Sequence, residues 1–99
     1  MSEKFSKFTD DDMIDLLDDK ETRQHYLNEV IADGDLDEFK RAIFYIAKAE
    51  GIEKVAKRAN LNRESLYKIF KPNSKPRFES IFKILKALNL QTSFVYKAS

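Results

Sequence analysis

Residues 51–78 read GIEKVAKRANLNRESLYKIFKPNSKPRF, and the pattern of this stretch decides the fold. It predicts two short helices, residues 53–59 and 63–70, which are separated by a tight turn. Two short helices joined by a turn of three or four residues form a helix-turn-helix, and we place its core at residues 53–70. Pro72 prevents the second helix from continuing, because proline lacks the backbone donor and clashes with the preceding turn.

Four positions in this stretch meet the steric requirements of the motif. Ala56 is small enough to let the second helix approach the first closely. Asn60 lies at the turn residue that needs a positive φ, which asparagine tolerates better than most residues. Leu61 is expected to pack beneath the turn, and Leu66 to hold the second helix on the core. A generic helical hairpin seldom meets all four requirements.

The rest of the chain predicts further helices in a single domain. A chain of 99 residues with two glycines and two prolines has few turn formers for an all-β fold. Capping residues and apolar spacing place other helices at residues 9–17, 20–32, 36–50 and 77–88. We therefore predict an all-α domain of five or six short helices over residues 9–99, after a flexible tail at residues 1–8. Residues 91–97 are rich in β-formers and are compatible with a short C-terminal strand.

Single residues mark where these helices begin and end. Asp18 or Asp19 is expected to cap the second helix, and Gly34 to end it in the left-handed conformation. Asp35 and Glu38 have the spacing of a capping box at the start of the third helix. The apolar face of that helix is Phe39, Ile43, Ile46 and Ala47. The last helix is expected to bury Phe78, Ile81, Phe82, Leu85 and Leu88.

The composition excludes several kinds of site. The chain has no cysteine, which rules out disulfides, thiolate nucleophiles and cysteine-based zinc sites. Its single histidine, His25, has no supporting motif for a catalytic triad, and the acids at residues 10–12 lack the spacing of a calcium loop. We therefore predict that the protein is not an enzyme and uses no cofactor. No run of residues matches a membrane span or a signal peptide, so a cytoplasmic location is expected.

The net charge of +1 conceals two halves of opposite charge. Residues 1–39 contain four Lys/Arg and thirteen Asp/Glu, a net charge of −9. Residues 40–99 contain fourteen Lys/Arg and four Asp/Glu, a net charge of +10. A basic half of this kind indicates a polyanionic partner, with mutual neutralisation of the two halves as the alternative.

The second helix of the motif has an outer face that the core does not need. Residues on this face or at its start are Asn62, Arg63, Ser65, Tyr67 and Lys68. A recognition helix places such residues against base edges in the major groove, where Arg reads guanine and Asn reads adenine. Phosphate contacts are expected from Lys54, Lys71, Lys75 and Arg77. A merely solvated helix face is the alternative interpretation.

Residues 51–90 resemble the Cro/repressor type of helix-turn-helix and, more narrowly, the addiction-module antidote (antitoxin) proteins. The resemblance rests on Val55-Ala56, on residues 60–68 (NLNRESLYK) and on Lys75-Pro76-Arg77-Phe78. Tyr26-Leu27-Asn28 and Gly34-Asp35 resemble the N-terminal part of that family, so the likeness covers about residues 10–95. Asn60 and Asn62 stand where the family has Gly and Ser, but they keep the same local chemistry.

The resemblance implies a specific function. Proteins of this family are encoded beside a small toxin of the RelE/ParE type, neutralise it and repress their own operon. Because such toxins are typically basic, the resemblance also implies a partner-binding role for Asp10, Asp11, Asp12, Asp15, Asp18 and Asp19. Helix capping and solubility are the alternative explanation of these acids.

Three functions remain open at this point. The first is an antitoxin and autorepressor that binds double-stranded operator DNA and a small basic toxin. The second is a phage-like transcriptional regulator without a toxin, and the third is an interaction module whose basic face meets an acidic protein. A homodimer is expected because one recognition helix covers few base pairs, and the β-prone residues 92–96 are the expected part of its interface.

Overall fold

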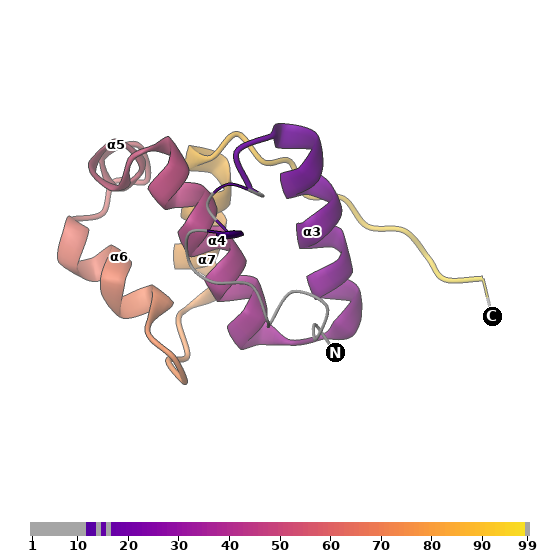
Figure 1. The fold of residues 1–99 in the computed structure, drawn as a ribbon. Helices are drawn as coiled ribbons and strands as arrows, with labels where there is room; N and C mark the ends of the chain where they lie inside the picture. The colour runs from indigo at the N-terminus through magenta and orange to yellow at the C-terminus, as the bar shows by residue number, and fades with distance from the viewer. Residues whose placement is uncertain (1–11, 14, 16, 99) are drawn as a thin grey trace.

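The computed structural model describes residues 12, 13, 15 and 17–98, and this part of the chain contains helices and no strand (Figure 1). The helices in chain order are α3 (Lys20–Asp33), α4 (Leu36–Glu50), α5 (Ile52–Arg58), α6 (Arg63–Phe70) and α7 (Phe78–Ala87). The all-α prediction is confirmed, and each of these helices begins and ends within one residue of its predicted bounds. The predicted tail and most of the predicted first helix lie outside the described residues.

α4 is the central helix, because it is covered on two sides. Figure 1 shows α4 between α3 on one side and the α5–α6 pair on the other, and it contacts all three helices. Its predicted apolar face is confirmed, since Ile43, Ile46 and Ala47 are buried and Phe39 packs partly against the core. Tyr45 is buried as well, because a helix covered on two sides needs more than one apolar stripe.

Capping side chains set the boundary between α3 and α4. Asp19 accepts a hydrogen bond from the backbone amide three residues later, and Gly34 ends α3 with a φ of 75°. Asp35 accepts a hydrogen bond from the Glu38 amide at 3.0 Å and thereby caps α4. The prediction that Glu38 completes a capping box is wrong, because its carboxylate accepts a hydrogen bond from the Tyr26 hydroxyl instead. Burial and this bond raise the pKa of Tyr26 above its usual value.

A buried arginine joins the start of α3 to the end of α4. Arg23 donates from Nε to the carbonyl oxygen of Leu17, and its Nη1 lies 2.8 Å from Glu50 Oε2. The hydrogen bond from Arg23 holds the pKa of Glu50 below its usual value. Met13 and Leu17 are fully buried, so the segment before α3 contributes to the core.

The first turn of α7 departs from the predicted core. Phe78 is 74% exposed and Phe82 is 39% exposed, and their rings stack on each other with centres 5.8 Å apart. The buried face consists of Ile81, Ile84 and Leu85. Phe82 lies about 100° around the helix from Ile81 and therefore points toward the edge of the packed face.

The residues after Leu90 do not form the strand that their composition allows. Residues 91–98 have no regular secondary structure, and Figure 1 shows this segment running past α3 to the C-terminus. Phe94, Val95 and Tyr96 are 95%, 89% and 101% exposed. A strand needs a neighbouring strand for its backbone hydrogen bonds, and the described residues of this chain supply none.

Replacing Glu50 with Gln is expected to reduce the loss of unfolding free energy that occurs when the pH falls into the acid range. The folded-state pKa of Glu50 lies below its ordinary value of 4.5, so its charge stabilises the fold above that pH. This contribution is lost as the pH falls through the folded-state pKa. Urea unfolding between about pH 7 and pH 3 should show a less stable Glu50→Gln variant at neutral pH that converges with the wild type in acid.

Glu64→Gln, which removes one exposed negative charge from α6, is the control for net charge. A difference between wild type and Glu50→Gln that stays constant across the pH range would contradict this assignment.

Candidate nucleic-acid interface

α5 and α6 form the predicted helix-turn-helix. Ala56 is buried on α5, and its carbonyl oxygen accepts a hydrogen bond from the Leu61 amide at 2.9 Å. Asn60 adopts the left-handed conformation that the turn requires, with a φ of 57°. Leu66 is fully buried on α6, and Leu61 packs partly against the core. The four predicted steric roles are confirmed, and together they fix the position of α6 relative to α5.

The first turn of α6 begins with a side-chain cap. Asn62 Oδ1 accepts a hydrogen bond from the Ser65 amide at 2.7 Å. Because this oxygen is engaged, the side-chain nitrogen of Asn62 is the group that remains to donate to an outside partner. Asn62 is exposed, whereas Ser65 is half-buried. Ser65 is therefore the least accessible of the five residues predicted to read bases.

Arg63 and Tyr67 form a cationic and aromatic pair on the outer face of α6. The Arg63 guanidinium carbon lies 5.6 Å from the centre of the Tyr67 ring, and a hydrogen bond with Tyr67 raises the pKa of Arg63. Arg63 Nη1 also lies 3.5 Å from Glu53 Oε1 on α5, with both side chains largely exposed. Exposed ion pairs contribute little to stability, so Arg63 is able to exchange Glu53 for a more strongly charged partner.

Phe44 of α4 supports this face from the inside. Its ring centre lies 5.8 Å from that of Tyr67 in an edge-to-face arrangement and 5.2 Å from that of Phe70. Nothing in the position of Phe44 along its own helix points to α6, so the sequence analysis missed this contact. Because Phe44 packs against Tyr67, the aromatic part of the outer face has a defined position.

The residues predicted to contact phosphates lie on α5 and on the loop between α6 and α7. Lys54 is exposed on α5, Lys71 and Lys75 on the loop between α6 and α7, and Arg77 immediately before α7. α6 has eight residues and is about 12 Å long, so Arg63 and Lys71 stand about one helix length apart. Positive charge therefore occurs at both ends of α6 rather than at one end alone.

A buried lysine on α4, which the sequence analysis missed, holds the loop between α6 and α7. Lys40 is 1% exposed, and its Nζ donates hydrogen bonds to the Lys71 carbonyl oxygen (3.1 Å), the Ser74 carbonyl oxygen (2.8 Å) and Ser74 Oγ (2.9 Å). The Lys40 charge is balanced by Asp37 Oδ1 at 3.1 Å. Asp37 also accepts a hydrogen bond from the Asn73 amide at 3.4 Å. α4 thus anchors the loop at several backbone atoms.

The acids predicted to meet a basic partner precede α3 in the sequence. Asp12, Asp15, Asp18 and Asp19 are exposed, whereas Asp10 and Asp11 lie outside the described residues. Asp19 has a structural role as the N-cap of α3, and its hydrogen bonds with Thr22 lower its pKa. Figure 1 places α3 on the opposite side of α4 from α6.

Comparison with known proteins identifies the family. The family model described as "Probable addiction module antidote protein" matches residues 6–96. The chain belongs to the addiction-module antidote family. It is also 34% identical over 91 residues to an uncharacterised protein of Haemophilus influenzae, an alignment that covers 92% of this chain and 91% of that protein. No solved structure matches the chain.

Among the residues that the structure describes, no group of His, Asp and Glu side chains is placed to hold a metal ion. None of the helices in the same part of the chain is long and apolar enough to cross a membrane. His25 is exposed on α3.

Replacing Lys40 with Met is expected to lower the free energy of unfolding by roughly 3 kcal/mol. The carbonyl oxygens of Lys71 and Ser74 would lose a charged donor, and Asp37 would lose its counter-ion. Urea unfolding measures the loss of stability, and amide hydrogen exchange should show faster exchange across residues 71–75.

Lys57→Met on the exposed side of α5 is the matched control and should change stability by less than about 0.5 kcal/mol. Unchanged exchange of the loop amides in Lys40→Met would show that Lys40 does not hold the loop.

Proposed function

We propose that this antidote protein is a DNA-binding antitoxin of a type II toxin–antitoxin module, which neutralises a RelE/ParE-type toxin and represses its own operon. The outer face of α6 carries the DNA-binding part of the proposal, because its polar and basic side chains are exposed on a helix that the core holds in place. The family match supports the toxin-binding part. The proposed activity is binding alone, without a catalytic step or a cofactor.

The proposed reading helix is α6. A major groove about 12 Å wide admits an α-helix, and the N-terminal residues of a recognition helix contact the base edges. Arg63 is exposed at that end and suits bidentate recognition of guanine. Asn62 Oδ1 already accepts the capping hydrogen bond, which fixes the orientation of the side chain and competes with bidentate recognition of adenine. Arg63 is therefore proposed to provide most of the sequence discrimination, with Tyr67 and Lys68 on the same face and Ser65 in a lesser role.

Phosphate binding is proposed for the basic residues around α6. These residues are Lys54, Lys71, Lys75 and Arg77. The loop that carries Lys71 and Lys75 is tied to α4 by Lys40. A loop that is ordered before binding loses less conformational entropy when DNA binds, so this anchoring favours affinity.

A homodimer is part of the proposal, because a single reading helix covers only a few base pairs. A two-fold dimer doubles the contacts and sets half-sites about one DNA turn, roughly 34 Å, apart. Residues 92–96 lack partners in secondary structure and expose large apolar side chains, as a dimer interface requires.

Toxin binding is proposed for the acidic segment that leads into α3. Surface charge of one sign attracts a partner of opposite charge and speeds association. Asp19, the N-cap of α3, belongs to the helix that lies across α4 from α6, away from the proposed DNA-binding face, where its charge would repel phosphates (Figure 1). A regulator without a toxin is the alternative function, but it leaves the family match without an explanation.

Replacing Arg63 with Ala is expected to weaken operator binding by about 1–3 kcal/mol and to relax preference at one base position. Lys71→Ala should weaken binding to all DNA equally and lower the salt slope by about one, because it removes a phosphate contact. Competition between operator and random DNA at two salt concentrations separates the two effects.

Lys20→Ala, which removes an exposed charge at the start of α3, is the control and should leave operator preference unchanged. If the Arg63→Ala variant still preferred operator over random DNA to the same degree, the base-contacting surface would lie elsewhere.

Replacing Asp10, Asp11, Asp15 and Asp18 with Asn is expected to slow association with the toxin, most strongly at low salt. Asp19 is kept because it caps α3. Stopped-flow or surface-based kinetics with the product of the adjacent gene measure the effect, and operator binding should be kept or slightly strengthened.

Equal association rates at low salt would remove the steering role of these acids. If the wild type bound no neighbouring gene product, the plain DNA-binding regulator would become the better account.

A further inference from the structure

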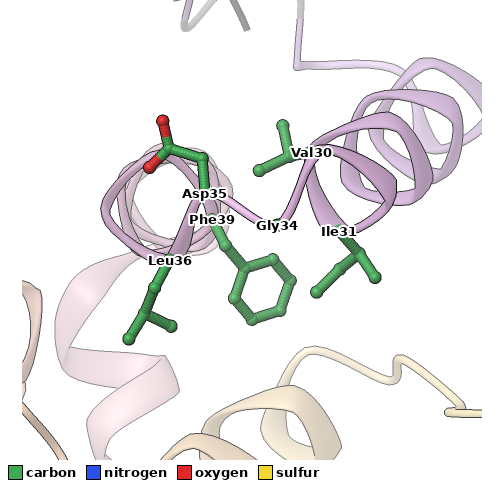
Figure 2. A pocket seen from close by; sticks show the side chains of 6 residues that line it. All are labelled: Val30, Ile31, Gly34, Asp35, Leu36 and Phe39. Atoms are coloured by element: carbon green, nitrogen blue, oxygen red, sulfur yellow. The ribbon is translucent and has the colours of Figure 1, made fainter. Parts of the chain in front are cut away.

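A small apolar pocket lies where α3 ends and α4 begins. Its volume is about 140 Å³, and it is lined by Val30, Ile31, Gly34, Asp35, Leu36 and Phe39. Figure 2 shows the side chains of Ile31, Leu36 and Phe39 projecting to the same side of the turn. The turn residue Gly34 contributes no side chain, and apart from its two chain neighbours no residue has an atom within 4 Å of where its Cβ would be. The pocket is therefore open at Gly34, between the apolar side chains at the end of α3 and those at the start of α4.

The pocket is of a size and character that suit one aromatic ring. Ile31 is 58% exposed and Leu36 is 54% exposed, which is unusual for large aliphatic side chains next to a buried valine. An enclosed apolar cavity of about 150 Å³ is large enough for benzene, so the volume of this open pocket is comparable with that of one aromatic ring. Covering Ile31 and Leu36 would remove apolar surface from water, which favours an apolar occupant.

The pocket has acidic surroundings. Asp33, Asp35 and Asp37 are exposed at this turn, and Lys40 balances the charge of Asp37. The charges of Asp33 and Asp35 remain, and the sequence has no lysine or arginine between Arg23 and Lys40. The potential around the pocket is therefore negative, and it favours an occupant that carries positive charge and no acids.

The C-terminal segment of the same chain has the matching chemistry. Phe94, Val95 and Tyr96 are almost completely exposed, so they make no extensive contact with their own domain. Lys97 follows them, and the sequence contains no acid after Glu79. One chain thus has an apolar pocket that is surrounded by acids and an exposed apolar segment that is followed by a lysine.

We propose that residues 94–97 of one copy dock into the pocket between α3 and α4 of a second copy, with Phe94 or Tyr96 as the ring that enters. The inference rests on the proposed homodimer and names the contact that builds it. The segment that follows Leu90 runs away from the helices past α3 (Figure 1). Six residues in an extended conformation span about 20 Å. This length is enough for Phe94 and Tyr96 to contact a second copy of the protein.

If each copy docks its C-terminal segment into the other copy, the dimer has no unoccupied pocket and no free segment. Each copy gives one C-terminal segment and receives the other, so a two-fold axis satisfies both pockets and both segments. A one-way contact would leave a free segment and a free pocket at the two ends and would add further copies. The proposal therefore specifies a dimer of two tail–pocket contacts and excludes a dimer in which the two C-terminal segments pair only with each other.

Two variants separate these arrangements. Leu36→Asp places a charge in the pocket and is compatible with folding, because Leu36 is exposed and an acid suits the first turn of α4. Phe94→Ser combined with Tyr96→Ser removes the rings from a segment that makes no core contact. Sedimentation equilibrium without DNA should show a dimer for the wild type and a dissociation constant raised roughly tenfold or more for each variant alone.

Mixing the two variants is the decisive measurement. In a mixed dimer the Leu36→Asp copy supplies an intact segment and the other copy an intact pocket, so one tail–pocket contact survives. Because the chain has no cysteine, Ala32→Cys added to the Phe94→Ser/Tyr96→Ser variant and Ala98→Cys added to the Leu36→Asp variant give a selective readout. A disulfide between the two different copies, well above the level of either self-linked product, is expected in the mixture.

Three outcomes would overturn the proposal. A monomeric wild type would do so, as would a pocket variant that keeps the full affinity of the dimer, which would indicate pairing of the two C-terminal segments. A mixture without the mixed disulfide would also do so. These measurements contain no DNA and no toxin. A pocket variant with full dimer affinity or a missing mixed disulfide would leave the proposed function standing, and a monomeric wild type would remove only its homodimer. Failure of the wild type to bind DNA would count against that function alone.

Discussion

Burial of α4 on two sides is the constraint on which the other helices depend. α3 packs against one side, and α5 and α6 pack against the other, so α4 joins α3 to the helix-turn-helix. Polar groups at the ends of α4 complete this arrangement: Lys40 and Asp37 near its start bind the loop after α6, and Glu50 at its end binds Arg23. The helix that shapes the core thereby also positions the proposed DNA-binding loop.

Local chemistry explains why so much of the fold was predictable from the sequence. Asp19, Asp35 and Asn62 each cap the helix that follows, and Gly34 and Asn60 adopt the positive φ that their positions require. These features depend on residues within one helical turn of each other, and the printed sequence contains all the information that they need. The steric roles in the helix-turn-helix were predictable for the same reason.

Contacts between distant residues explain what was missed. The position of Lys40 in the sequence suggests a solvated lysine, and only the approach of the loop 31 to 34 residues later gives its ammonium group buried acceptors. Phe44 and Glu38 likewise find their partners on other helices. The prediction that Phe78 and Phe82 are buried was wrong because the spacing of apolar residues identifies the buried face of a helix but not the edges of that face. The predicted C-terminal strand is absent because residues 91–98 have no neighbouring strand among the described residues.

The shortness of α5 and α6 has a consequence for how the protein loses its recognition surface. They contain seven and eight residues, and isolated helices shorter than about 12–15 residues are marginal in water. Neither helix persists without the packing that α4 provides. The surface formed by α6 is therefore all-or-none: it exists in the folded domain and vanishes with it. Each 1.4 kcal/mol of lost stability multiplies the unfolded fraction about tenfold, and a protease that cuts only unfolded chains then removes the surface in proportion.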